Sequence, residues 1–224
     1  MQRMLVTTLV LAAAGCGHFS FSSGVYSRDG VDLPHHRWVP LAVPEGTAHL
    51  VLTAGTEDIS LTAGTAAIEV QVFSEVENDG TVALVGGEPV VTSASGHIVA
   101  IDGVRGTVPA ATELVVTNGT GDVRLVGLQG APHLRIKCGT GDILLGDAVL
   151  DDVTTDCGTG DLKLEGSKLG RLDARCGTGD IRLRGSQVST GLIKAGTGDV
   201  VLSGHSDLGS ATTDFGTGEL RSGD

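Results

Sequence analysis

Aromatic side chains are scarce in this sequence, with one Trp, one Tyr and four Phe among 224 residues, or 3%. Aromatic residues usually supply much of the buried area of a bulky globular core. Their scarcity, together with 35 glycines, favours thin stacked coils of backbone over such a core. The length fits one domain preceded by a short leader.

Positive charge is also in short supply. The chain has 15 Lys and Arg against 27 Asp and Glu, a formal net charge of −12 at pH 7. A chain this acidic is repelled by nucleic-acid phosphates and by anionic lipid surfaces. The balance therefore argues against both as partners.

Familiar catalytic motifs are missing as well. The seven histidines are dispersed, and there is no Gly-x-Ser-x-Gly, no Cys-x-x-Cys and no phosphate loop leading into a helix. A polysaccharide-cleaving β-helix needs acidic and basic residues clustered in a groove of long loops. The candidate loops, residues 74–110, contain no Lys and one Arg, Arg105. We therefore expect no catalytic site, no bound cofactor and no enzymatic activity.

One tetrapeptide, Gly-Thr-Gly-Asp, returns at a fixed interval through the second half of the chain. Successive copies start 19 or 20 residues apart, which is typical of a repeat architecture. The copies are Gly119–Asp122, Gly139–Asp142, Gly158–Asp161, Gly177–Asp180, Gly196–Asp199 and a variant ending in Glu, Gly216–Glu219.

Residues on both sides of each copy alternate between apolar and polar, as in strands with one buried face. Around the second copy the apolar positions are Leu134, Ile136, Ile143 and Leu145. Nineteen residues are too few for a βαβ unit, which needs roughly 30. We predict an all-β chain: a single β-helix, or β-solenoid, of coils of about 19–20 residues, with parallel ladders about 4.8 Å apart and a right-handed path.

The expected organisation has four parts. Residues 1–15 read as a signal peptide and 16–47 as a lipid-attachment Cys followed by a tether. Residues 48–110 read as degenerate coils, with an imperfect corner at Gly55 and about three coils' length before Gly119. Residues 111–224 read as regular repeats that continue the same stack.

The N-terminus resembles an export signal. An apolar stretch of signal-peptide length precedes Ala13-Ala14-Gly15-Cys16, which resembles a bacterial lipobox with Ala in place of Leu. The resemblance implies cleavage before Cys16 and its lipidation. The alternative is an ordinary signal peptide with Cys16 incidental. Gly17 is not the Asp that retains many lipoproteins in the inner membrane, so the outer membrane is the expected location.

These features together resemble a known family. An apolar strand followed by Gly55 and Ile59, a variable central region, Val108-Pro109 and the tandem Gly-Thr-Gly-Asp units resemble the bacterial "putative adhesin" family over residues 45–222. The resemblance implies a β-strand-repeat envelope domain and transfers no catalytic residue. We expect a lipid-anchored binding or structural module for glycans, envelope polymers or proteins, because the family motif itself indicates a fold and no activity. A periplasmic regulatory or envelope-stress partner is the alternative.

The repeat places one acidic residue per coil on a single edge, and like charges about 4.8 Å apart repel by about 1 kcal/mol in water. Corner amides, basic residues two positions on, or calcium could each offset this repulsion. We prefer the first two over a calcium column, because calcium-binding β-rolls use a different, nine-residue repeat. The candidate surface ladder comprises Asp122, Asp142, Asp161, Asp180, Asp199 and Glu219 with Arg124, Lys163 and Arg182.

Three cysteines, Cys138, Cys157 and Cys176, recur one repeat apart at an inward-facing position. We expect a buried ladder of small free thiols. One disulfide is the alternative, because exported proteins form disulfides readily. Parallel neighbours, however, hold their Cβ atoms farther apart than a disulfide prefers, and three cysteines leave one unpaired.

Overall fold

A computed structural model describes residues 19–22 and 25–223. Within these residues the regular secondary structure is entirely β, and no helix is long and apolar enough to cross a membrane. The expected signal peptide and Cys16 lie outside the described residues. Two large sheets dominate, and we call the ten-stranded one the front sheet and the seven-stranded one the back sheet.

The front sheet runs, edge to edge, through β22 (Leu220–Ser222), β20 (Val200–Ser203), β18 (Ile181–Arg184), β16 (Leu162–Glu165), β14 (Ile143–Gly146), β12 (Val123–Val126), β6 (Ile59–Ala63), β10 (Val99–Val108), β7 (Ala67–Ser74) and β4 (His35–Leu41). The back sheet runs through β21 (Thr212–Phe215), β19 (Gln187–Ala195), β17 (Lys168–Thr178), β15 (Val149–Thr159), β13 (His133–Thr140), β11 (Glu113–Asn118) and β5 (His49–Ala54). Two small sheets contain β1 (Phe19–Ser22), β2 (Val25–Arg28) and β3 (Val31–Leu33), and the hairpin β8 (Thr81–Val85) and β9 (Glu88–Thr92).

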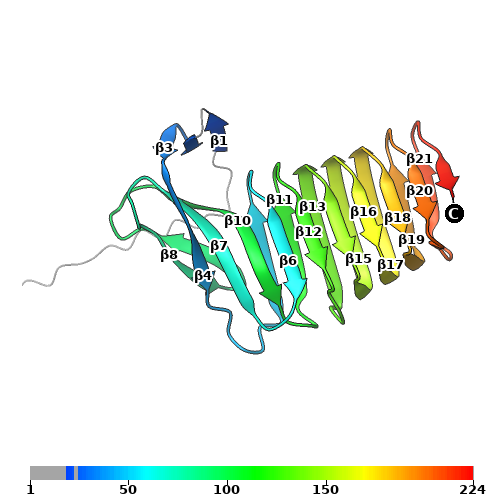
Figure 1. Cartoon of the computed structure of the whole chain (residues 1–224), viewed down its shortest axis with the longest axis horizontal. Coiled ribbons are helices and arrows are strands. Elements are labelled where there is room, and N and C mark those ends of the chain that lie inside the picture. The colour runs from blue at the N-terminus through cyan, green and yellow to red at the C-terminus, as the bar shows by residue number, and fades with distance from the viewer. Residues whose placement is uncertain (1–18, 23–24, 224) are drawn as a thin grey trace, which may run out of the picture.

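Each regular coil gives one strand to each large sheet, and a Gly-Thr-Gly-Asp corner joins the two strands. Neighbouring coils pair in parallel with equivalent residues in register; Leu145, for example, lies between Leu125 and Leu164. The coils stack side by side along the long axis of the molecule (Figure 1). The predicted all-β solenoid with parallel ladders is confirmed.

The core is the space between the two sheets, filled by the inward residues of every coil. One column of inward residues is fully buried from the first coil to the fifth regular one. It consists of Ile59, Val123, Ile143, Leu162, Ile181 and Val200. No single coil could bury these side chains alone, so stacking itself creates the core.

The N-terminal part differs from the expected run of degenerate coils. Strands β5 and β6 pair directly with β11 and β12, so Leu50 lies against Leu114 and Ile59 against Val123. Residues 48–63 thus form one coil, and the 64–110 segment is an insertion. Its strand β7 runs antiparallel to both β10 and β4. Gly86 and Gly87, with φ of 61° and 90°, allow the tight β8–β9 hairpin turn that a coil would not contain.

The expected tether of residues 16–47 is also only partly a tether. Residues His35–Leu41 form β4, which pairs antiparallel with β7 along its whole length and is the outer edge of the front sheet. Strands β2 and β3 pack Tyr26 and Leu33 against Phe73 and Ala100. The apolar positions of this segment were too irregularly spaced to indicate strands, because edge strands bury only part of one face.

Candidate functional site: the aspartate ladder and its groove

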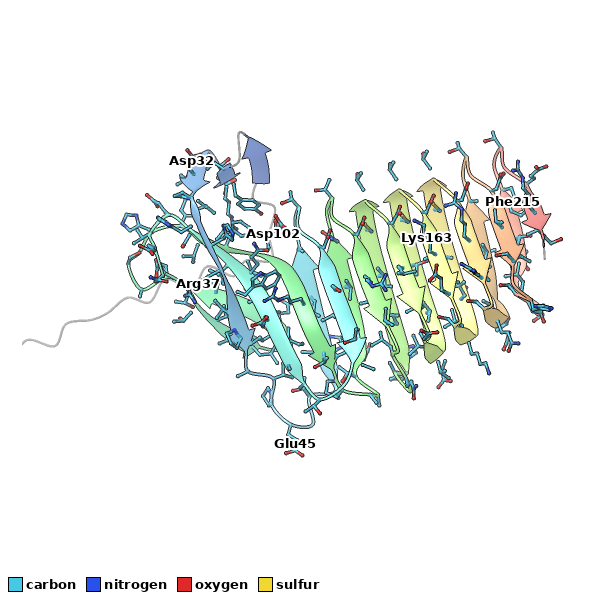
Figure 2. The ribbon with its side chains drawn as sticks, in the orientation of Figure 1. Asp32, Arg37, Glu45, Asp102, Lys163 and Phe215 are labelled. Atoms are coloured by element: carbon cyan, nitrogen blue, oxygen red, sulfur yellow. The ribbon has the colours of Figure 1, made fainter. Side chains whose placement is uncertain are left out.

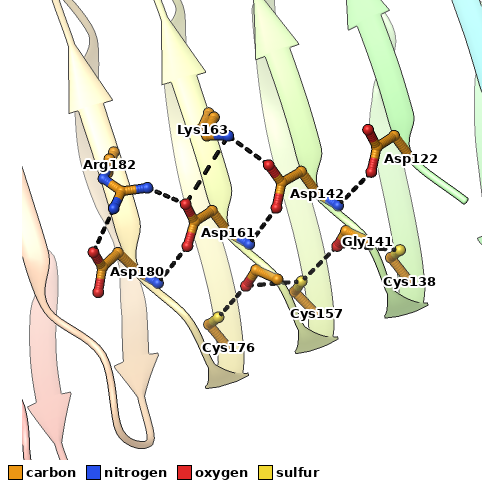
Figure 3. Close-up of polar contacts among 11 residues, drawn as sticks. Asp122, Cys138, Gly141, Asp142, Cys157, Asp161, Lys163, Cys176, Asp180 and Arg182 are labelled. Atoms are coloured by element: carbon orange, nitrogen blue, oxygen red, sulfur yellow. Dashed lines mark hydrogen bonds and ion pairs between the residues drawn. The ribbon is translucent and has the colours of Figure 1, made fainter. Parts of the chain in front are cut away.

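The acidic column at the corners is a continuous hydrogen-bonded ladder (Figure 3). In each coil the acidic residue donates its backbone N–H to the Oδ1 of the acidic residue one coil earlier. All six of these N···O distances lie between 2.7 and 3.0 Å. The members, in order along the stack, are Asp58, Asp122, Asp142, Asp161, Asp180, Asp199 and Glu219.

Basic side chains of the next column pair with the second carboxylate oxygen. Lys163 Nζ lies 2.5 Å from Asp142 Oδ2 and 3.9 Å from Asp161 Oδ2. Arg182 bridges Asp161 and Asp180, the latter at 2.6 Å. Arg221 does the same for Asp199 and Glu219 at the end of the stack, at 3.1 and 2.7 Å. From Asp142 to Asp199 the mutual repulsion is therefore offset by an amide on one carboxylate oxygen and a cation on the other, whereas Asp58 and Asp122 have the amide alone.

The ionisation of the ladder reflects these contacts. Burial alone would raise the pKa of Asp142, but the Asp161 N–H and the Lys163 ammonium together hold it below its ordinary value. The hydrogen bond to Asp142 in turn raises the pKa of Lys163. Both groups are thus charged across the neutral range, and from Asp142 to Asp180 carboxylates and cations alternate.

Arg124 stands apart from the other predicted cations. It shares their column, in register with Leu144 and, one coil further, with Lys163. Yet within the described residues it has no ion pair to an acidic side chain. It lies instead at one end of an open groove of about 380 Å³ on the outer face of the front sheet.

The groove crosses several coils beside the ladder. Its polar lining includes Arg124, Asp147, Glu165 and Arg184, and glycines such as Gly146 lower its floor. Glu165 and Arg184 are register partners on β16 and β18, and no ion pair to another described residue occupies either of them. The groove therefore presents two guanidinium groups and two carboxylates that are available to a polar ligand.

Metal binding has little support in this donor set. Within the described residues, no three His, Cys, Asp or Glu side chains are grouped as a metal ion would require. The ladder oxygens are also committed, because Oδ1 of Asp142, Asp161 and Asp180 accepts an amide and Oδ2 pairs with a cation. A calcium ion would have to displace these lysine and arginine contacts.

A family model matches residues 43–221, which is most of the chain. The chain belongs to the Toastrack DUF4097 family. Two solved structures are similar to this toastrack chain over 84% of its length. One, a "putative adhesin" from Bacteroides fragilis, has 13% identity, 97% of its own chain covered and a TM-score of 0.46. The other, a "putative cell adhesion protein" from Clostridium sporogenes, has 9%, 98% and 0.31. Comparison with curated proteins gives no match.

The toastrack corners also bury the three cysteines predicted to form an inner ladder. Cys138, Cys157 and Cys176 stack in register and are free. Each thiol approaches two corner carbonyl oxygens, so Cys157 Sγ lies 3.5 Å from Gly141 O and 3.4 Å from Gly160 O. Burial, before any neighbouring charge, raises the pKa of Cys138 to about 11. The hydrogen bond with Cys157 instead lowers the pKa of Cys176, so the three buried thiols are not equivalent.

Two polar features of the toastrack fold were missed from the sequence. Asp58 begins the ladder, although Glu57 replaces the second glycine of its corner; aligning Ile59 with Val123 would have revealed it. At the opposite turn, Ser167, Ser186 and Ser206 form a second ladder in which each hydroxyl accepts the preceding coil's backbone N–H at 3.1 Å. Their spacing of 19 or 20 residues was visible in the sequence.

The third missed feature is Asp102, which is fully buried at the N-terminal end of the solenoid (Figure 2). Its carboxylate accepts the N–H of Gly55 at 2.5 Å, the N–H of Thr56 at 3.0 Å and the Thr56 hydroxyl at 2.7 Å. Tyr26 donates its hydroxyl to the same carboxylate. In later corners these amides donate to the carbonyls of a preceding coil, as Thr120 N–H does to Gly55 O. Asp102 replaces that missing coil.

Proposed function

We propose that this chain is a non-catalytic, adhesin-like module of the bacterial cell envelope, anchored through a lipid on Cys16. The lipobox-like sequence supports the anchor. The observation that carries the binding role is the register of the outward residues. The column that begins at Arg124 and includes Lys163 and Arg182 repeats with one residue per coil. A ligand that spans several coils therefore meets a row of evenly spaced groups.

The ligand class that suits such a surface is an extended polymer, either a glycan or another envelope polymer. One coil offers a single weak polar contact, whereas several in a line raise the avidity without new chemistry. Lys163 and Arg182 are held by the ladder. The direct contacts are therefore assigned to the groove, through Arg124, Glu165 and Arg184.

The binding test is retention on purified envelope polymer. Arg124→Ala and Arg184→Ala are measured singly and together, with Arg175→Ala as the matched control on the exposed face of the back sheet. We expect a loss of severalfold for each groove variant, a larger loss for the pair, and no change for the control. The melting temperature of each variant shows that folding is intact.

The ladder cations give the second arm of this test. Lys163→Ala and Arg182→Ala, alone and combined with Arg124→Ala, test whether the ladder cations contact the polymer or only hold neighbouring coils together. If the Arg124/Arg184 pair binds like the native chain, the groove is not the site. If the ladder variants also bind normally, the whole front face is scaffold, and the insertion loops become the place to examine.

The anchor has its own test. Cys16→Ser should abolish incorporation of labelled palmitate and release the protein from the membrane fraction. A variant at a buried cysteine, Cys157→Ala, is the control, because its thiol lies in the core. Unchanged membrane association of Cys16→Ser would remove the lipid anchor from the proposal without affecting the polymer-binding arm.

A further inference from the structure

The two ends of the solenoid are chemically different. At the N-terminal end the insertion extends the front sheet by β10, β7 and β4, and Asp102 satisfies the first corner. The outermost strand there, β4, contains Pro40, which has no N–H to offer. A proline in this edge strand disfavours pairing with a further strand.

At the C-terminal end both large sheets stop at an unpaired strand among the described residues, β22 in the front sheet and β21 in the back sheet (Figure 1). The residues that flank β22 bond to β20: Glu219 O accepts from Val200 N–H, and Gly223 N–H donates to Leu202 O. Because backbone groups alternate in direction along a strand, Leu220 and Ser222 turn their N–H and C=O to the free side. Such a row is a template for another strand.

The same edge interrupts the core. Leu220 is the register partner of Val200 and continues the fully buried inward column. No further coil among the described residues covers Leu220, which is 47% exposed, whereas Val200 is 0% exposed. Phe215 of β21 is partly buried and packs against the same core (Figure 2). A further strand paired with the free edge of β22 would bury Leu220.

We infer that a second copy of this chain docks there, tail to tail, by antiparallel pairing of the two β22 strands. With Leu220 opposite Leu220 of the second copy, both leucines present their free N–H and C=O to each other. The same register places Glu219 opposite Arg221 twice, by two-fold symmetry. These are non-hydrogen-bonded positions, where side chains approach most closely.

The charges select this register and orientation. Glu219 and Arg221 project from the same face of β22, where they already pair with each other at 2.7 Å. In the antiparallel dimer Glu219 of each copy faces Arg221 of the other, so the ion pair within one chain is replaced by ion pairs between the two chains. A parallel partner in register would instead place Glu219 on Glu219 and Arg221 on Arg221, which is repulsive. Tail-to-tail docking would join two binding faces into one longer array.

The register can be tested by cross-linking the full chain in membranes. In the Glu219→Cys/Arg221→Cys double variant, each new thiol faces its partner across a pair whose Cα atoms lie about 4.5 Å apart. That separation is within the roughly 4.4–6.8 Å that disulfides span. We expect a disulfide-linked dimer on non-reducing gels. Either single variant, whose thiol faces a native side chain, should give at least tenfold less. Val149→Cys, at a similarly exposed apolar position, is the matched control.

Charge reversal provides an independent measurement on the detergent-solubilised full chain. Arg221→Glu should weaken the dimer at least tenfold by light scattering, and the swapped pair Glu219→Lys/Arg221→Glu should restore it. Leu220→Asp should give a monomer with a nearly unchanged melting temperature. Equal cross-linking of the single variants or of Val149→Cys would overturn the inference. A chain that is monomeric at every concentration would also overturn it. Protection of the β22 amides by a different molecule, with the chain still monomeric, would overturn it in the same way.

Discussion

The carboxylate of Asp161 accepts a hydrogen bond from the backbone N–H of Asp180, 2.9 Å away and one coil further along the stack. Its other oxygen pairs with Arg182, so one side chain fixes two neighbouring coils. Asp161→Ala removes the acceptor and leaves the Asp180 N–H to water. We expect a loss of about 1–2 kcal/mol in the free energy of unfolding, since a bond to a charged group is lost while like-charge repulsion is relieved.

Asp156→Ala is the matched control for this change. Asp156 is an exposed carboxylate of β15, and the structure gives it no hydrogen bond or ion pair with any described residue. Its removal should change the stability by less than about 0.5 kcal/mol. Chemical denaturation compares the two, and amide exchange at Asp180 should accelerate only in Asp161→Ala. Equal stability losses would mean that the ladder contributes charge but no structure.

Gly160 shows why the corners are made of glycine. Its φ is +132°, and a Cβ added there would lie 2.2 Å from Gly141 O of the preceding coil. Gly160→Ala should therefore cost at least about 3 kcal/mol, from backbone strain and forced separation of the coils. In Gly146→Ala the new Cβ would meet Val126 at an ordinary 3.6 Å, so little change is expected. Comparable melting temperatures for the two variants would contradict the close stacking.

The repeats were predictable because each coil sees nearly the same surroundings as the next. A residue such as Leu145 is buried for the same reason as Leu125 and Leu164. The repeat length of 19–20 residues and the alternation of inward and outward positions along each strand therefore predicted the whole column. The ladder carboxylates and their cations followed from the same spacing. The hydrogen bond from each acidic residue's amide to the previous carboxylate was not predicted in that form, because spacing shows proximity but not donor geometry.

The insertion was not predictable in the same way. Apolar alternation in β7 is the same whether its neighbours run parallel or antiparallel, so the pattern could not exclude further coils. The role of Asp102 depends on contacts with Gly55 and Thr56, 47 and 46 residues earlier in the chain. No local signal marks such a contact. A lone Asp in an apolar strand was the only hint.

The buried thiols lead to a prediction about reactivity. The thiolate is the reactive form, and burial raises the pKa of Cys138 to about 11. In a Cys16→Ser background, Cys138 of the folded chain should therefore react only slowly with a thiol reagent at pH 8, and more slowly than Cys176, whose pKa is lowered by its hydrogen bond with Cys157. Three thiols should be counted after denaturation without reductant. A count of one would instead indicate a disulfide between two of the stacked cysteines.

Acid should weaken the insertion through Asp79. Burial alone would raise the pKa of this carboxyl, but hydrogen bonds from Ser93, Ser95 and the N–H groups of Ala94 and Gly80 hold it well below its usual range. A depressed folded-state pKa contributes stability above the unfolded value, near 4, and that stability is lost as the pH falls through the folded value. Asp79→Asn should therefore cost about 2 kcal/mol at pH 7 and progressively less below pH 4. A pH-independent difference in unfolding free energy would contradict this assignment.

Asp102 should prove the most sensitive polar residue of the fold. Asp102→Ala leaves the N–H groups of Gly55 and Thr56 and the Tyr26 hydroxyl without their buried acceptor. We expect a loss of at least about 3 kcal/mol, because each unsatisfied buried group costs about 1–3 kcal/mol.

The location of the damage separates this role from general destabilisation of the core. Amide exchange should accelerate at Gly55–Asp58 well before the regular corner Gly139–Asp142, since only the first corner lacks a preceding coil. Tyr26→Phe removes one donor and should cost less than Asp102→Ala. Asp151→Ala, at an exposed position of β15, should be nearly neutral. Uniform acceleration across all the corners would show that Asp102 supports the core as a whole and does not replace the missing coil.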